Sequence, residues 1–267
     1  MHKLAQRYRY SVILLRELVR TDFKLRYQGS ALGYLWSLLR PLFLFTILYV
    51  IFVHFAKTIK TPHPGVYLLL GVILWNYFVE VTSGSVGAIV SRGDILRKIN
   101  FPKYVIILAG SVSALINLLL NFIVLGVFMV LNHVPITVDT LMAIPVILEL
   151  FVLSLAVAFL LSALFVKFRD VSYIWEIAVQ GGFYLTPILY ELNILPHKVA
   201  KILILNPLAQ IIQDARHAIV SASTQTVPQL YGGDKWIWLI PIGLVLMVTI
   251  VGASYFRHQS KSFAEEV

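Results

Sequence analysis

The sequence predicts an all-α polytopic membrane protein, and three observations lead to this prediction. Hydrophobic residues make up 59% of the 267 residues and charged residues only 13%, about half of the charged share usual in a soluble domain. The apolar residues form long runs of about 20 residues or more, the length that a helix needs to cross a bilayer. These runs are apolar on every side and lack the two-residue alternation of barrel strands, so we expect helices.

Six such runs occur along the chain, and we expect six transmembrane helices. The first, residues 31–56, is interrupted only by Arg40. It follows a polar segment without a small-residue cleavage pattern, so we expect a retained span and not a cleaved signal peptide. The other five runs contain at most one charged residue each and cover residues 66–90, 104–131, 140–166, 171–190 and 236–256.

The connection between the last two spans, residues 191–235, contains two short apolar stretches. They cover residues 199–205 and 208–220 and are separated at Asn206–Pro207. Each stretch is too short to cross a bilayer, and the second has apolar residues at helical spacing. We interpret the pair as re-entrant or interfacial helices, with a seventh span as the open alternative.

Basic residues indicate how the spans are oriented. With six spans both termini lie on one side, and 16 of the 22 Lys and Arg residues fall on that side, against six on the other. Because basic residues are retained in cytoplasmic loops, we expect both termini in the cytoplasm. The net charge of +9 is therefore mainly an orientation signal.

Residues 1–30 are predicted to form a cytoplasmic amphipathic helix, separate from a transmembrane domain of residues 31–267. Arg16 and Arg20 belong to a basic stripe, leucines and valines cover the opposite half, and Asp22 lies one turn from Arg26, its expected charge partner. Two interpretations stay open, a membrane-surface anchor and a docking surface for a cytoplasmic partner. Nucleic acid is not expected, because the basic residues alternate with a lipid-facing stripe and no aromatic platform accompanies them.

The loop after the second span, SRGDILRKINFPK from Ser91 to Lys103, is short, basic and amphipathic. Ser91 or the Gly93–Asp94 pair could cap a helix of about two turns, which Phe101–Pro102 would end. Taken alone, the loop is equally typical of a basic membrane-return loop in any polytopic protein.

No motif in the sequence indicates enzymatic chemistry. The phosphate loop G-x-x-x-x-G-K-[ST], the nucleophile motif G-x-S-x-G and the zinc motif H-E-x-x-H are all missing. The chain has no cysteine, and its seven histidines lack the spacing of a metal site. We therefore expect no catalytic residue and no metal site in this chain.

Three glutamates, Glu80, Glu149 and Glu176, lie within predicted spans, where ionisable groups are costly and often functional. A proton relay is one interpretation. We favour the other, in which each glutamate faces an aqueous cavity or bonds a neighbouring helix, because no Lys or Arg accompanies them at depth. Aromatic residues near span ends, such as Trp36 and Trp75, fit an interfacial belt as well as stacking on sugar rings.

The stretch DFKLRYQGSALGYLWSLLRPL, residues 22–42, resembles the opening segment of the permease subunit of ABC-2 type exporters. The likeness is greatest to the branch that exports O-antigen polysaccharide and wall teichoic acid. It continues through YLLLGVILWNYF and KINFPKYVIIL and covers essentially the whole chain. The pattern R-Y-x-x-x-x-L-G-x-L-W-x-x-x-x-P is matched by Arg26, Tyr27, Leu32, Gly33, Leu35, Trp36 and Pro41.

This resemblance implies a half-transporter, in which two copies form a conduit and two copies of a separate cytoplasmic ABC ATPase dock below it. The coupling helix of the family corresponds to residues 91–103, and the N-terminal helix also contacts the ATPase. The implied coupling residues are Arg16, Arg20, Arg92, Gly93, Asp94, Arg97 and Lys98. The outer helices would gate the exit, and our candidates for conduit and gate are Tyr34, Trp75, Glu80, Glu176, Pro207 and Asp214.

The leading hypothesis is therefore the membrane-channel subunit of an ATP-driven exporter in the bacterial plasma membrane. Its substrate would be a lipid-linked polysaccharide or teichoic acid, and ATP and Mg²⁺ would bind the partner ATPase, with no cofactor on this chain. An ABC-2 exporter of drugs or small lipids is the first alternative. A proton-coupled secondary transporter working through the intramembrane glutamates is the second.

Overall fold

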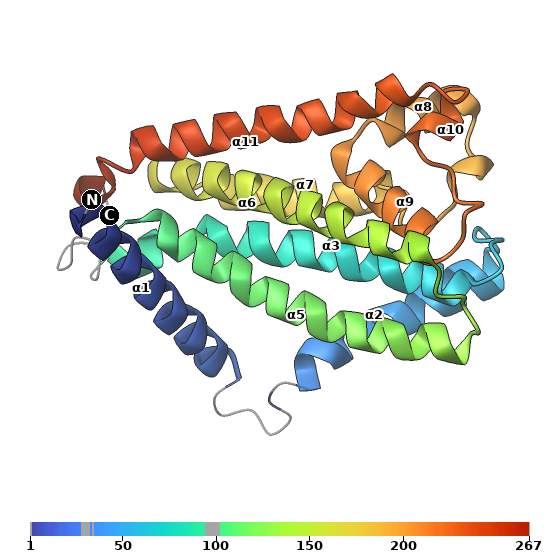
Figure 1. The fold of residues 1–267 in the computed structure, drawn as a ribbon, viewed down its shortest axis with the longest axis horizontal. Helices are drawn as coiled ribbons and strands as arrows, with labels where there is room; N and C mark the ends of the chain where they lie inside the picture. The colour runs from blue at the N-terminus through green and yellow to red at the C-terminus, as the bar shows by residue number, and fades with distance from the viewer. Residues whose placement is uncertain (1, 28–32, 34, 94–101, 267) are drawn as a thin grey trace.

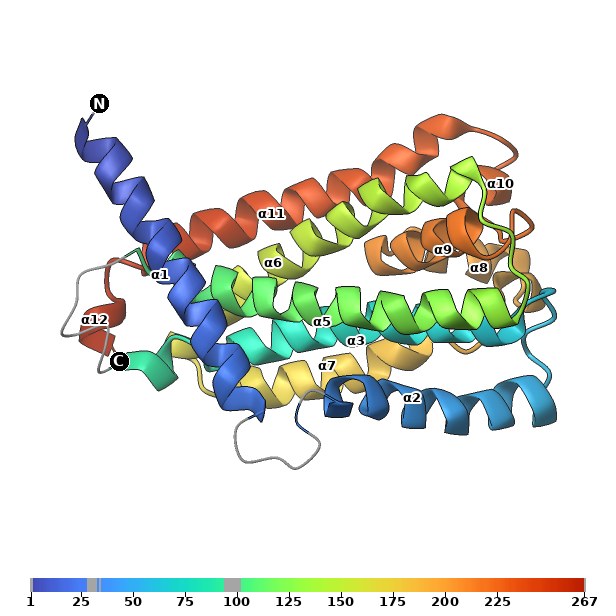
Figure 2. The ribbon, with the colours of Figure 1, turned by 60° about the horizontal axis from the view of Figure 1, so that its bottom comes forward.

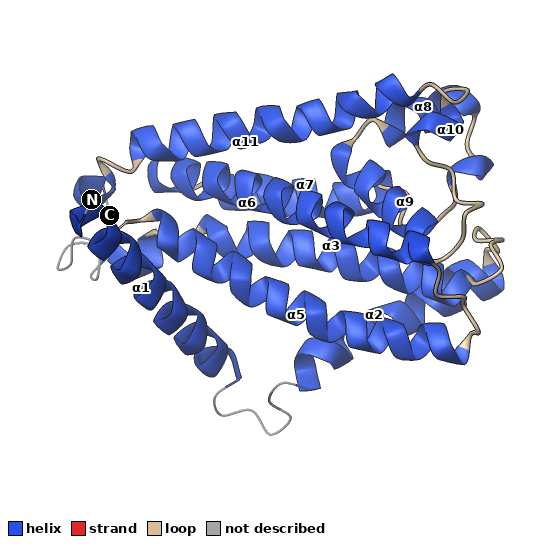
Figure 3. Ribbon diagram, in the orientation of Figure 1, coloured by secondary structure: helices blue, strands red, loops and turns tan. Residues whose placement is uncertain are grey.

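The computed structural model describes residues 2–27, 33, 35–93 and 102–266. Throughout these ranges the chain forms helices joined by loops, with no strand (Figure 3). The long helices lie side by side in a bundle (Figure 1). They are α2 (Leu35–Tyr49), which continues as the π-helix η1 (Val50–Phe55), α3 (Pro64–Val86), α5 (Tyr104–Leu131), α6 (Ala143–Lys167), α7 (Val171–Leu185) and α11 (Leu239–Gln259).

Among the residues that the structure describes, five segments are long and apolar enough to cross a membrane. They are Leu35–Phe55, Pro64–Val86, Tyr104–Leu131, Val138–Lys167 and Trp236–Gln259, and the fourth includes the 3₁₀ turn η3 (Val138–Met142) before α6. Helix α7 has only 15 residues, because the chain leaves the helix at Thr186–Pro187, where proline cannot continue it. The chain is therefore a multi-pass helical membrane protein, with five of the six expected runs forming helices of spanning length.

Helix α3 is the centre of the bundle. In its most apolar stretch of 18 residues, 83% of the residues are buried, against 11% in the span of α2 and 17% in the span of α11. Helix α3 contacts α2, α5, α6, α7 and α9. Helix α11 packs on α6 at Gly252, where an added Cβ would meet the backbone of Ala156. A glycine at this position lets the two helix backbones approach closely, as small residues do between membrane helices.

Helix α1 (His2–Tyr27) crosses the bundle at one end and packs on α5 (Figure 2). Both termini lie at this end, where the short helix α12 (Phe263–Glu266) follows α11. The 3₁₀ turn η2 (Val90–Arg92) follows α3 here as well. The residues predicted to form the short coupling helix, 94–101, lie outside the described part of the chain.

The opposite end carries a cap of short helices, α8 (His197–Ile204), α9 (Pro207–Ile219) and α10 (Val227–Leu230), with the 3₁₀ turns η4 (Leu192–Ile194) and η5 (Lys235–Trp238) (Figure 1). The two predicted stretches of residues 199–205 and 208–220 correspond closely to α8 and α9. The break between them follows from sequence, because the Oδ1 of Asn206 accepts a hydrogen bond from the Leu208 amide at 3.1 Å and Pro207 opens α9.

One buried arginine fixes this cap to the bundle. Arg216 of α9 is fully buried, and its guanidinium donates to the carbonyl oxygens of Tyr67 at 3.0 Å, Pro187 at 2.5 Å and Ile188 at 2.8 Å. It also stacks 3.6 Å from the ring centre of Tyr67. These contacts tie α9 both to α3 and to the chain that leaves α7. Gly71 of α3 leaves the space that the guanidinium occupies.

Candidate functional site: a polar cleft beside α3

A cavity of about 980 Å³ lies between α2, α3 and α5. Each of the three helices contributes polar side chains to it, although all three have the length and composition of membrane spans. The polar and aromatic lining residues are Trp36, Ser37 and Arg40 from α2, Asn76, Tyr77, Glu80 and Ser83 from α3, and Asn117 and Asn121 from α5. A cleft of this composition can hold hydroxyl-rich and charged groups within an otherwise apolar bundle.

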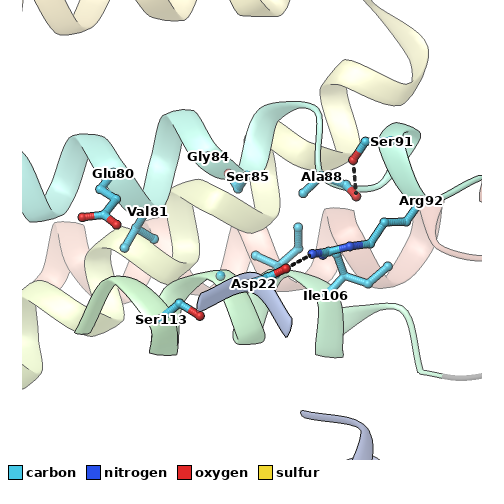
Figure 4. Close-up of a pocket in the computed structure, with 12 residues that line it drawn as sticks. Asp22, Glu80, Val81, Gly84, Ser85, Ala88, Ser91, Arg92, Ile106 and Ser113 are labelled. Carbon is cyan, nitrogen blue, oxygen red and sulfur yellow. Dashed lines mark hydrogen bonds and ion pairs between the residues drawn. The ribbon is translucent and has the colours of Figure 1, made fainter. Parts of the chain in front are cut away.

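A second cavity of about 460 Å³ lies nearer the termini, between α1, α3 and α5 (Figure 4). Asp22 and Arg92 close one side of it, and Ser85 and Ser113 add hydroxyl groups. Glu80 and Gly84 line both cavities. The two cavities therefore adjoin at these residues, and we call them together the polar cleft.

Helical spacing explains how the polar side chains converge. Asn76 and Glu80 are one turn apart on α3, and Asn117 and Asn121 are one turn apart on α5. The Nδ2 of Asn117 donates to the Oε1 of Glu80 at 2.8 Å, and the Nδ2 of Asn121 donates to the carbonyl of Asn117 at 2.8 Å. Glu80 thus both bonds a neighbouring helix and faces a cavity, as the sequence interpretation favoured.

An ion pair joins α1 to the turn that follows α3. The Nη2 of Arg92 lies 2.5 Å from the Oδ1 of Asp22, and the two side chains keep 22% and 23% of their surface exposed. Asp22 therefore pairs with a residue 70 positions away, whereas the sequence suggested Arg26, whose side chain lies outside the described part. The other coupling candidates on α1, Arg16 and Arg20, are exposed.

Three residues of the family-like opening motif lie at the polar cleft. Gly33, Trp36 and Pro41 all line its larger cavity. Gly33 has φ +47°, a left-handed conformation that glycine adopts without steric cost. Arg26 and Tyr27 form the last turn of α1. Tyr34, Asp94, Arg97 and Lys98 lie outside the described residues, and Gly93 at the edge of this gap is buried.

The remaining gate and conduit candidates lie at separate places. Trp75 is buried between α3 and α7, with ring centres 6.0 Å from Phe78 and 5.7 Å from Phe183. Glu176 is exposed on α7, and Pro207 opens α9 in the cap. Asp214, also in the cap, accepts hydrogen bonds from the side chains of Gln210 and Trp238. Of the six candidates, Glu80 alone among those described lines the cleft.

Sequence reasoning missed several residues that line the polar cleft, above all Asn76, Asn117 and Asn121. A usable signal was present for the last two, because polar residues one helical turn apart in an apolar span mark a common face. Nothing in the sequence indicated that three helices meet around Glu80, because this arrangement depends on how each helix is rotated in the bundle.

The bundle and its polar cleft define a multi-pass helical membrane protein with polar cavities between its spans. The model of the ABC-2 type transporter family matches residues 13–220. That match covers most of the chain, and the protein belongs to this family.

Curated relatives resemble the chain over nearly its whole length. One O-antigen export system permease protein RfbA from Klebsiella pneumoniae is 29% identical over 259 residues, covering 96% of this chain and 95% of the relative. A second protein of that name from the same species is 28% identical over 258 residues, with the same coverage. The Myxococcus xanthus protein of that name is 28% identical over 265 residues, 97% of each chain.

Proposed function

We propose that this chain is the membrane-channel subunit of an ATP-driven ABC exporter for a lipid-linked polysaccharide or teichoic acid. The observation that carries the proposal is the near full-length likeness to O-antigen export permeases of two genera, within a family that the chain belongs to. The polymer moves from the cytoplasmic side across the bacterial plasma membrane. ATP and Mg²⁺ bind a separate ATPase chain and not this subunit.

In this proposal the chain crosses the membrane six times, with both termini in the cytoplasm. The sequence supports this through its basic residues, and the two termini lie at one end of the bundle (Figure 1). Helix α7 is the additional crossing. It runs alongside α3 (Figure 2), and its 15 residues span about 22 Å at 1.5 Å per residue. The chain after Leu185 covers the rest, and the α8–α10 cap, including the re-entrant pair, faces outward.

The second copy covers the exposed face of α7. No side chain of this helix is buried, and Tyr173, Ile177 and Tyr184 are each about two-thirds exposed or more. Glu176 and Gln180 are exposed on the same helix, and a glutamate facing lipid would be costly. A homodimer that encloses a conduit along α7 removes that cost and offers aromatic rings to sugars.

The polar cleft receives the carrier end of the substrate. Arg40 supplies a cation that suits the phosphate of a lipid carrier, and the asparagine and serine side chains suit sugar hydroxyls. Helix α2 exposes large apolar side chains beside it, including Phe43 and Ile47. A lipid chain could pack there while its headgroup enters the cleft.

The partner ATPase docks at the end that carries the termini. Arg16 and Arg20 of α1 are exposed there, and the Asp22–Arg92 ion pair connects α1 with the start of the predicted coupling segment, residues 91–103. ATP-driven closure of the ATPase would move both elements together and shift the channel between two states.

A pair of glycine variants tests the polar cleft as a substrate site. A Cβ at Gly84 meets nothing within 4 Å, and Gly84 lines both cavities; a Cβ at Gly126 of α5 is equally free. Gly84→Phe should fill the cleft and abolish surface polymer while membrane expression stays normal. Gly126→Phe, the matched control, should keep export.

Deletion of the gene tests the function itself. We expect loss of surface polymer and accumulation of carrier-linked polymer inside the cell. Normal surface polymer together with new drug sensitivity would instead support a drug or small-lipid exporter. Export that survives Gly84→Phe at normal levels would rule out the cleft as the substrate site and leave the family function standing.

A further inference from the structure

A short tail follows the last membrane span and folds back onto the end of the bundle. We call residues 260–266 the C-terminal tail. It leaves α11 after Gln259 and contains the short helix α12. Two backbone hydrogen bonds shape its turn, from the Ser260 amide to the Phe256 carbonyl at 2.8 Å and from the Ser262 amide to the Gln259 carbonyl at 3.0 Å. The tail lies at the same end of the bundle as α1 (Figure 2).

Phe263 attaches the C-terminal tail to the bundle. Its side chain is fully buried, and its ring centre lies 5.5 Å from that of Phe256 on α11, with 77° between the ring planes. The ring of Phe256 in turn lies 4.8 Å from that of Phe159 on α6. Terminal residues are poorly ordered in most proteins unless a contact holds them, and here an edge-to-face aromatic contact does so.

Lys103 contacts the C-terminal tail at two points. Its Nζ donates a hydrogen bond to the carbonyl oxygen of Ser260 and lies 5.5 Å from the ring centre of Phe263. Ser260 is the C-cap of α11, where the helix dipole favours a cation. An ammonium group near an aromatic ring adds a cation–π attraction. The lysine is therefore held by both the backbone and the buried ring of the tail.

The place of Lys103 in the sequence gives this contact its interest. Lys103 is the last residue of the predicted coupling segment, residues 91–103, and the N-cap of α5. Near the start of that segment, Arg92 forms its ion pair with Asp22 of α1. Of the segment, the structure describes residues 91–93 and 102–103. These two described ends are attached to different elements, to α1 at the start and to the C-terminal tail at the end.

We propose that the C-terminal tail positions the end of the coupling segment through Lys103, and that this contact is needed to couple ATP hydrolysis to export. The inference rests on the proposed function, because it requires an ATPase that docks at this end of the bundle. With both ends of the segment held, a push from the ATPase is passed on to α1, α5 and α11. Without the tail contact, the end of the segment would yield, and ATP would be hydrolysed without moving the helices. Lys103 and Phe263 act as positioning residues.

A spin label on the tail tests the contact without any substrate. The chain has no cysteine, so Lys261→Cys, at an exposed position of the tail, carries a single nitroxide in the full-length protein in detergent. We expect Lys103→Met to increase the mobility of this label, and Lys103→Arg to do so less, because arginine keeps a cation at the Ser260 carbonyl. A label at Arg257→Cys, exposed on α11, should not respond. A tail label with the same spectrum in Lys103→Met as in its parent would overturn the contact.

The amount of polymer exported per ATP hydrolysed tests the role in coupling, in the permease–ATPase complex reconstituted into vesicles. Lys103→Met and Phe263→Ala should each lower this ratio by about fivefold or more, while the ATPase still co-purifies. The two together should be no worse than the more severe single variant, because both break the same contact. Lys261→Met, the same substitution at an exposed lysine of the tail, is the matched control and should keep the wild-type ratio. Phe263→Leu replaces Phe263→Ala if the latter lowers expression.

Three results would overturn the proposal. A wild-type ratio in both variants would remove the role in coupling, and fully additive effects would remove the action through Lys103. Less protein with an unchanged ratio would show that the tail serves stability alone. A wild-type complex that hydrolyses ATP without exporting polymer would refute the proposed function instead, and the spin label would still decide whether Lys103 holds the tail.

Discussion

Replacing Gly252 by alanine should destabilise the packing of α11 on α6. A Cβ at this position would lie 3.2 Å from the carbonyl carbon of Ala156 and closer still to its oxygen, and ordinary contact begins at 3.4 Å. Both atoms belong to the α6 backbone, so no side chain can rotate away. Helix α11 must therefore move by on the order of 1 Å at this point, with loss of contact along the helix pair.

The expected cost follows from two opposing effects. Overpacking of this kind costs about 1–3 kcal/mol, and the better helix propensity of alanine returns up to about 1 kcal/mol. A net loss of about 1–2 kcal/mol lowers the melting temperature by roughly 3–6 °C in a chain of this size. Gly243→Ala on the same helix is the control. Its Cβ meets nothing within 4 Å, so this variant gains the helix propensity of alanine without any overpacking.

The assay heats detergent-purified protein and measures the monodisperse fraction by size-exclusion chromatography. Gly252→Ala should lose its monodisperse fraction at a temperature several degrees below that of the wild type. Gly243→Ala should lose it at the same temperature as the wild type or at a higher one. Equal melting of the two variants would refute the close approach of α11 to α6. Gly252→Val extends the series, and a larger side chain should lower the transition further.

Three further predictions concern polar contacts. Arg216→Met should lower the free energy of unfolding by roughly 3–5 kcal/mol, because it leaves buried carbonyl oxygens without donors. A melting temperature only 2–4 °C below that of the wild type would correspond to about 1 kcal/mol. Such a small change would contradict the role of Arg216 in attaching the cap. Neutralising the Asp22–Arg92 pair should lower the stability of the protein by at most about 1 kcal/mol but reduce transport-coupled ATP hydrolysis. A double-mutant cycle that measures both stability and ATPase activity checks these two effects. Burial raises the pKa of Asp214 above the ordinary 3.8, so the folded state binds this proton more tightly and loses stability as pH rises through the raised value. Melting curves should therefore show a flatter pH dependence for Asp214→Asn than for wild type.

The features that the sequence predicted best are those imposed by lipid. A helix surrounded by hydrocarbon must be apolar on every side, so the long runs of α2, α3, α5, α6 and α11 were visible without any tertiary knowledge. The start of α9 was equally readable, because Asn206 and Pro207 are a cap and a first-turn proline. The predicted run of residues 171–190 was longer than α7, since proline at 187 ends the helix before the apolar composition changes.

Polar partners were not predictable, because they depend on the rotation and neighbours of each helix. Arg216 counted in the sequence as one of six basic residues on the outer side, yet its guanidinium is buried against three carbonyls. Asp22 forms its ion pair with Arg92, which lies 70 positions away in the sequence. No local rule selects such partners, since many polar residues could meet a given arginine or aspartate in a bundle.

The two ends of the bundle use their polar groups in different ways. Nearer the termini, polar side chains line the smaller cavity of the polar cleft. Beside the cap several polar side chains bind backbone instead, since Glu191 accepts from the amides of Lys60 and Thr61 at 2.6 and 2.7 Å, and Thr58 donates to the carbonyl of Leu189 at 2.8 Å. These bonds and those of Arg216 connect the chain after α7 to the chain after α2 and to α9. A movement of α7 that preserved them would carry α9 with it, so opening of the cap requires either a joint movement of these elements or the loss of buried hydrogen bonds.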